Sequence, residues 1–197
     1  MPVTEKRITR ADILDFDAFA RQRTERRKAL IPTKKLRRIE VGPFATFYFE
    51  SFETMLFQVQ EMLHIERGGE AQIEDELHAY NPLIPQGSEL VATVMFEIED
   101  ARRREETLKR LTHVEEHLFI KIGADKIYCK PEEDVERTSP DGKTSSVHFV
   151  RFPISDAQKA VFRSPTTEIF VGIDHENYSH MAQLSPANRA ELARDFD

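Results

Sequence analysis

The order of strand-like and helix-like segments is the feature that most limits how this chain of 197 residues can fold. Some strand-like segments follow one another across tight turns, at Gly42-Pro43 and at Gly123-Ala124-Asp125, and such turns are typical of hairpins. Other strand-like segments are separated by stretches with the apolar spacing of a helix, as in residues 51–67. This mixture predicts an α+β fold, with a mainly antiparallel sheet, helices packed on one face and an N-terminal helical arm.

Each element is expected from its periodicity and from the residues that bound it. Pro32 removes a backbone donor, so the first helix should end at about Leu30. Ser155 with Gln158 forms a capping box, and Pro186 marks the start of a C-terminal helix. The expected strands are residues 37–50 in two short pieces, 89–100, 116–123, 126–130, 146–152 and, as the last, 167–174.

Charge divides the chain unevenly. Residues 1–40 hold 12 basic and 6 acidic residues, whereas the remainder holds 16 basic and 29 acidic residues. We therefore expect a basic helical arm over residues 1–38, packed on a single α+β domain over residues 39–197.

Residues 21–38 carry nine basic residues and one acidic residue. A solvated helix packed against the acidic body is the preferred interpretation, because a charge run is usually a solvated face. Contact with nucleic acid through residues 21–38 is the weaker alternative. The acidic body makes wider nucleic-acid binding unlikely, because it would repel phosphates, and the arm lacks interleaved aromatic residues for base stacking.

Composition also limits the compartment. No run approaches the roughly 18 apolar residues that cross a bilayer, and the first residues lack the apolar segment of a secretory signal. Cys129 is the single cysteine, which fits a reducing compartment. We therefore expect a cytoplasmic protein that does not bind membranes.

The common phosphate-binding and nucleophile motifs are absent, as is any C-x-x-C pair. Glu61 and His64 have the spacing of a di-iron ligand pair, but such a site needs about four converging helices, and the pattern supports only two. A solvated helix face is the preferred interpretation of that pair. The sequence leaves open whether the chain is an enzyme.

His148 and His175 are the histidines best placed for function. Alternation places His148 on one face of its strand with Val150 and Phe152, and His175 just past a strand end, beside Asp174 and Tyr178. If the two strands are neighbours and both imidazoles face one cavity, they form a site. If the strands are not neighbours, His148 is a core residue and His175 a turn residue. Ser146 shares the face of His148.

Four segments, in order, resemble a bacterial family known as domain of unknown function 3501: residues 41–67, the loop AYNPLIP (79–85), residues 145–155 and residues 171–178. The resemblance covers the chain from about residue 8 to its end. It implies no activity, cofactor or catalytic residue. Members of the family are often encoded near rubrerythrin and an iron–sulfur oxidoreductase, which by association implies a redox or peroxide-stress setting.

The sequence thus leads to two hypotheses. In the first, the protein is a non-catalytic binding or accessory factor of that redox module, with rubrerythrin or the iron–sulfur oxidoreductase as partner. It would present an exposed, proline-stiffened loop and the histidine-bearing end of the sheet. The expected binding residues are Tyr80, Asn81, Ser146, His148, Asp174, His175 and Tyr178.

In the second hypothesis, His148, His175 and Asp174 hold a metal ion. Two imidazoles and a carboxylate suit iron or zinc. The oligomeric state is not indicated by the sequence.

Overall fold

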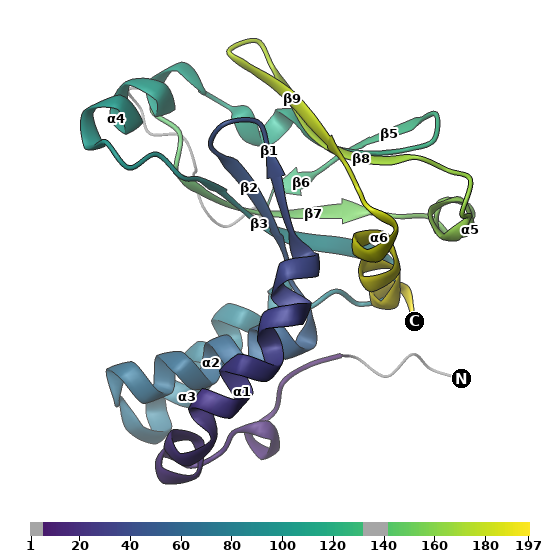
Figure 1. Cartoon of the computed structure of the whole chain (residues 1–197). Helices are drawn as coiled ribbons and strands as arrows, with labels where there is room; N and C mark the ends of the chain where they lie inside the picture. The colour runs from purple at the N-terminus through teal and green to yellow at the C-terminus, as the bar shows by residue number, and fades with distance from the viewer. Residues whose placement is uncertain (1–5, 132–141) are drawn as a thin grey trace.

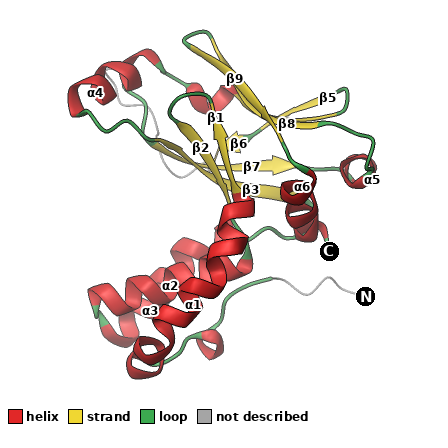
Figure 2. Cartoon of the chain, in the orientation of Figure 1, coloured by secondary structure: helices red, strands yellow, loops and turns green. Residues whose placement is uncertain are grey.

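The computed structural model describes residues 6–131 and 142–197. It confirms the α+β class, with strands gathered in one part of the molecule and the three longest helices in another (Figures 1 and 2). The helices are α1 (Phe16–Arg37), α2 (Phe52–Glu66), α3 (Gly69–Tyr80), α4 (Ala101–Arg110), α5 (Asp156–Arg163) and α6 (Pro186–Leu192). The strands are β1 (Arg38–Val41), β2 (Ala45–Phe49), β3 (Glu89–Phe96), β4 (Leu118–Ile122), β5 (Asp125–Tyr128), β6 (Lys130–Pro131), β7 (Val147–Pro153), β8 (Ile169–His175) and β9 (Tyr178–Gln183).

The strands form two antiparallel sheets. One has the order β1-β2-β3-β7-β6 and the other the order β5-β4-β8-β9. Alternate residues of both sheets meet in the main hydrophobic core, among them Phe47, Phe152, Ile120 and Val171. This packing explains the alternating burial of β7, in which one face is buried in the core and the other is half-buried.

A helical layer, α1 to α3, packs on the outer face of the five-stranded sheet (Figure 1). Met55 and Val59 of α2 and Leu77 of α3 form a second core, which includes Val91 of β3. The N-terminal segment closes this core with Ile8. Met55 and Val59 lie about one helical turn apart and thus share the buried face of α2.

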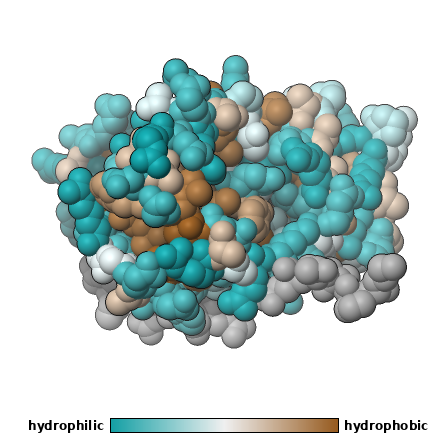
Figure 3. Space-filling model, turned by 90° about the horizontal axis from the view of Figure 1, so that it is seen from below, coloured by the Kyte–Doolittle hydropathy of each residue, from teal (hydrophilic) through white to brown (hydrophobic). Residues whose placement is uncertain are grey.

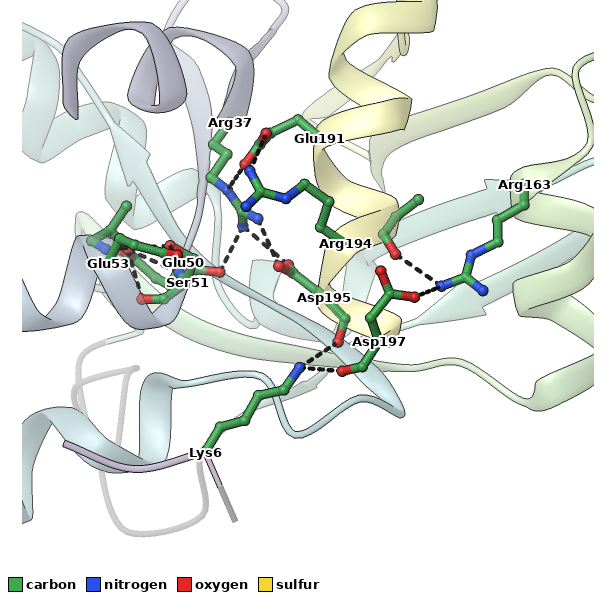
Figure 4. A network of polar contacts seen from close by, with 12 residues as sticks. Lys6, Arg37, Glu50, Ser51, Glu53, Arg163, Glu191, Arg194, Asp195 and Asp197 are labelled. Atoms are coloured by element: carbon green, nitrogen blue, oxygen red, sulfur yellow. Dashed lines mark hydrogen bonds and ion pairs between the residues drawn. The ribbon is translucent and has the colours of Figure 1, made fainter. Parts of the chain in front are cut away.

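The first helix is longer than expected. We predicted its end at about Leu30, but α1 continues through Pro32 to Arg37. An internal proline costs about 3 kcal/mol, so tertiary contacts must hold the last turns. The guanidinium of Arg37 supplies them: it contacts Glu191 and Asp195 and donates to the backbone carbonyl of Glu50 (Figure 4).

The boundary expected at residue 38 falls at the junction where α1 passes directly into β1. A second difference lies near the C-terminus, because β8 is not the last strand. Strand β9 pairs along β8 at the edge of its sheet, and most of its residues are exposed. An exposed edge strand lacks the apolar alternation by which a strand is recognised in a sequence.

Within the described residues, no helix is both long and apolar enough to span a membrane. Seen from below, hydrophobic surface gathers over the part of the molecule occupied by the helical layer (Figure 3). Phe16 and Ile65 are among the exposed large hydrophobic residues of this layer.

Candidate functional site

His148 lies in β7 and faces the core between the two sheets, where it is fully buried. Its Nε2 lies 2.9 Å from the carbonyl oxygen of Ser145 and 3.3 Å from Oγ1 of Thr144. The ring also meets the edge of Phe96. These contacts suit a core histidine whose ring nitrogen is engaged by the preceding turn. Ser146 lies in that turn, and its carbonyl oxygen accepts from the backbone of Phe96.

His175 ends β8 and is also buried. Its Nδ1 accepts from the backbone N–H of Asn177 at 3.1 Å, and its Nε2 lies 3.1 Å from the carbonyl oxygen of Thr112. The two contacts fit the tautomer that carries its proton on Nε2. His175 therefore orders the β8–β9 turn.

Asp174 points to the opposite face of β8. Its carboxylate accepts from Lys126 and Tyr128 and lies 3.1 Å from Nδ1 of His117. Partial burial acts to raise the pKa of Asp174, but the hydrogen bonds from these three neighbours lower it below its usual value. The carboxylate is thus held within a surface ion-pair network.

The structure does not bring these three residues together. β7 and β8 belong to different sheets and are not neighbours, so the condition for a shared histidine site is not met. In residues 6–131 and 142–197, no group of three or more His, Cys, Asp or Glu side chains is placed to hold a metal ion. Binding of iron or zinc by His148, His175 and Asp174 stays a prediction that this geometry does not support.

Tyr178 has a structural role at the first hairpin. Its buried hydroxyl donates to the carbonyl of Val41 at 2.6 Å and accepts from the backbone of Ala45 at 3.1 Å. Gly42 of the same turn has a φ of 74°, and a Cβ there would lie 2.6 Å from that hydroxyl. Only glycine fits both the backbone and the close approach.

The loop AYNPLIP was expected to expose apolar side chains, and this expectation is wrong. Leu83 and Ile84 are buried in the second core. The side chain of Asn81 bonds both the N–H and the carbonyl of Ile8, at 2.7 and 3.0 Å. Asn81 thus holds the N-terminal segment against the loop. The apolar side chains of the loop are buried because burial is more favourable than exposure to water.

A cleft of about 550 Å³ lies between the helical layer and the outer face of the five-stranded sheet. We call it the interlayer cleft. Its floor includes Tyr48, Thr93 and Phe149, which form one cross-strand row because Thr93 pairs with both neighbours. Met55 of α2 and Tyr80 of α3 line the side of the helices. Tyr80 is the one expected binding residue found here.

Glu50 is the one carboxyl among the described residues that line the cleft. It follows β2 directly, and its oxygens accept from Thr93 and Thr54, each at 2.8 Å. Burial raises the pKa of Glu50, against the lowering effects of the two threonine hydroxyls and of Lys34 and Arg37. Glu50 is half-buried, and a carboxyl with a raised pKa in a cleft is typical of functional sites.

The cations around the cleft differ in how they are neutralised. Arg37 is paired with two carboxylates, and Arg38 lies 3.1 Å from Glu40. Lys34 is exposed at the rim, with its Nζ 5.6 Å from the centre of the Phe57 ring. Glu50 therefore has hydroxyl partners and no salt bridge to a cation among the described residues.

Sequence reasoning missed Glu50. The available signal was a charged residue at the end of the aromatic run ATFYFE, immediately before the helix-capping Ser51. That position brings a polar group to a strand end. The cleft itself needs the packing of α1 and α2 on the sheet, which the sequence pattern did not show.

The comparisons with known proteins agree with the fold. No curated protein matches the chain. A crystal structure described as a novel protein of unknown function from Burkholderia pseudomallei has 37% sequence identity and a TM-score of 0.88, covering 96% of this chain and 99% of that one. The family model "Protein of unknown function (DUF3501)" matches residues 7–196. The chain therefore belongs to the DUF3501 family of proteins of unknown function.

Proposed function

We propose that this chain is a non-catalytic binding protein, which holds a small and mainly apolar molecule in the interlayer cleft. The observation that carries the proposal is the cleft itself: about 550 Å³, with aromatic and aliphatic side chains beside one half-buried carboxyl and three cations. Small-molecule sites are typically clefts of about 300–1,000 Å³ with mostly apolar walls and few polar groups.

The distribution of reactive side chains favours binding over catalysis. The described lining of the cleft includes no histidine, cysteine or serine. Cys129 lies in the main core, where burial, with a contribution from Glu115, raises the pKa of its thiol to about 12. Such a thiol remains protonated at neutral pH and is a poor nucleophile. His148 and His175 are engaged with backbone atoms outside the cleft.

Binding of Nile red, an uncharged dye whose emission shifts to the blue in apolar surroundings, tests the proposal. We expect one site per chain. Met95 lines the cleft and is half-buried, so Met95→Trp should fill the space and weaken binding at least tenfold.

Met181→Trp is the matched control, because Met181 is exposed on β9 and does not line the cleft. Its binding should equal that of the unchanged protein, with circular dichroism confirming that both variants fold. Absence of dye binding, or equal binding by the two tryptophan variants, would refute the cleft as the binding site.

The second part of the proposal concerns partners and rests on the family resemblance by association. We propose that the protein works beside an iron–sulfur oxidoreductase or rubrerythrin in a redox or peroxide-stress module. Co-purification of the chain with each candidate, with and without an occupied cleft, is the test. Failure of both to bind in either state would remove the partner part and leave the cleft part standing.

A further inference from the structure

The polar groups of the interlayer cleft define what kind of molecule it recognises. Glu50 is the single acidic group of the described lining, and its two oxygens are positioned by Thr54 and Thr93 on opposite sides. The backbone of Glu50 is also fixed, because its N–H donates to Val91 at 2.8 Å and its carbonyl accepts from Arg37 at 2.9 Å. The carboxyl is therefore pre-organised as a hydrogen-bond acceptor.

The partners of Glu50 leave its charge poorly compensated. Neutral hydroxyls stabilise a buried carboxylate less than a charged donor does. Arg37 gives its guanidinium to Asp195 and Glu191 and donates to the backbone carbonyl of Glu50 (Figure 4). The raised pKa of Glu50 is consistent with this shortage.

Aromatic side chains surround the same space. Tyr48 and Phe149 stand on the sheet and Tyr80 on α3. Faces of aromatic rings attract organic cations, and most strongly where water is excluded. A carboxylate beside aromatic walls is therefore suited to an ammonium or guanidinium group that carries an apolar body.

Three cations line the cleft and oppose such a ligand: Arg37 and Arg38 are paired with carboxylates, and the third is Lys34. It lies at the exposed rim, where water screens its field, whereas Glu50 lies deeper, where the effective dielectric constant is lower. The attraction to Glu50 should therefore exceed the repulsion from Lys34. An anionic ligand would be attracted by Lys34 at the rim, where water screens the charge. It would be repelled by Glu50 deeper in the cleft, where screening is weaker.

We propose that the interlayer cleft binds small organic cations, namely amines or guanidines with an apolar body, and that Glu50 pairs with their charge. This inference rests on the proposed function, because it needs a cleft that takes up small molecules. It adds the sign of the ligand's charge and names the residue that pairs with the charged group.

Displacement of Nile red by three ligands that share one carbon skeleton tests the inference: phenylpropylamine, phenylpropanol and phenylpropanoate. The amine is protonated at neutral pH, as lysine is. We expect the amine to bind about tenfold more tightly than the alcohol, because a hydrogen bond to a charged group is stronger than one between neutral groups. Phenylpropanoate should bind most weakly.

Two variants assign the effect. Glu50→Gln keeps the side-chain shape and should reduce the affinity of the amine to that of the alcohol, with each displacement referred to the variant's own affinity for Nile red. Lys34→Gln, at the exposed rim, should leave the fold unchanged and raise amine affinity slightly, by about twofold, since a screened charge contributes little.

The outcomes separate the two proposals. A carboxylate that binds best and weakens in Lys34→Gln would overturn the cation inference and leave the binding function intact. Equal affinities for the amine and the alcohol would overturn it as well. A protein that binds neither the dye nor any of the three ligands would overturn the proposed function itself.

Discussion

The two faces of the five-stranded sheet are packed in different ways. Its inner face meets the second sheet, and Phe47, Phe49 and Phe152 pack there ring against ring with no exposure to solvent. Its outer face meets the helical layer only in part, and the gap is the interlayer cleft. The inner face is thus closely packed, whereas the outer face leaves an open cleft.

The outer face of the four-stranded sheet provides a second contrast. There the ring of Phe119 lies over Gly172, so closely that a Cβ on Gly172 would be 2.3 Å from a ring carbon. An aromatic ring fills the space next to a glycine, and the surface closes without a helix. On the outer face of the five-stranded sheet, Thr93 lines the interlayer cleft instead.

The largest expected effect tests the difference between the two faces. Phe152→Ala on the inner face should lower the free energy of unfolding by about 3–5 kcal/mol, because it leaves a cavity in a closed core. Met95→Ala on the outer face should cost less than about 1 kcal/mol, because the side chain already borders open space. Guanidinium unfolding measures both. Similar losses would show that the outer face is as closely packed as the inner one.

The next effect concerns the closed outer face. Gly172→Ala should lower stability by about 1–3 kcal/mol, because the new methyl group must displace the ring of Phe119. Gly87→Ala gives the opposite case, since a Cβ there meets no atom within 4 Å but the residue has a φ of 97°, whereas Gly172 has no positive φ. A loss in Gly87→Ala therefore comes from backbone strain, and a loss in Gly172→Ala comes from the clash with Phe119. Thermal unfolding of both variants is the measurement, and an unchanged Gly172→Ala would contradict the close packing.

A pH-dependent effect should come from Glu50. Because its pKa is raised in the folded protein, the unfolded chain releases this proton first as the pH rises. Glu50 therefore lowers stability progressively from its unfolded pKa up through its folded pKa. Glu50→Gln lacks this loss, so the stability of the variant relative to the unchanged protein should increase with pH.

Guanidinium unfolding at several pH values, from mildly acidic to neutral, measures that difference. Glu40→Gln is the control, since Glu40 is exposed and lies outside the cleft. A difference between Glu50→Gln and the unchanged protein that does not vary with pH would mean that Glu50 is as well solvated as a surface carboxylate.

The smallest effect is expected at Asp174. Its pKa is lowered by Lys126, Tyr128 and His117, so it stabilises the fold above its unfolded pKa and loses this contribution as the pH falls through its folded pKa. The network lies at the surface, where an ion pair contributes about 0–1 kcal/mol. Asp174→Asn should therefore cost less than about 1 kcal/mol at neutral pH. A much larger loss would show that the outer face of this sheet depends on the network.

Local signals predicted much of the secondary structure. The capping box at Ser155 and Gln158 begins α5 as expected, and Gly42-Pro43 forms the turn between β1 and β2. The end of α1 could not be predicted, because the contacts that carry it past Pro32 come from residues 191 and 195. Sequence-local rules contain no information about partners so distant along the chain.

The candidate site shows the same difference between what local patterns predict and what distant contacts decide. Strand alternation alone predicted that His148 shares the buried face of its strand, because side-chain period is a local property. Only the tertiary structure placed β7 and β8 in different sheets, which separates His148 from His175. It alone packed the helices over β2 and β3, and this packing partly buries Glu50 and raises its pKa. A cleft between layers depends on how elements pack, and packing is decided by long-range contacts that no local pattern contains.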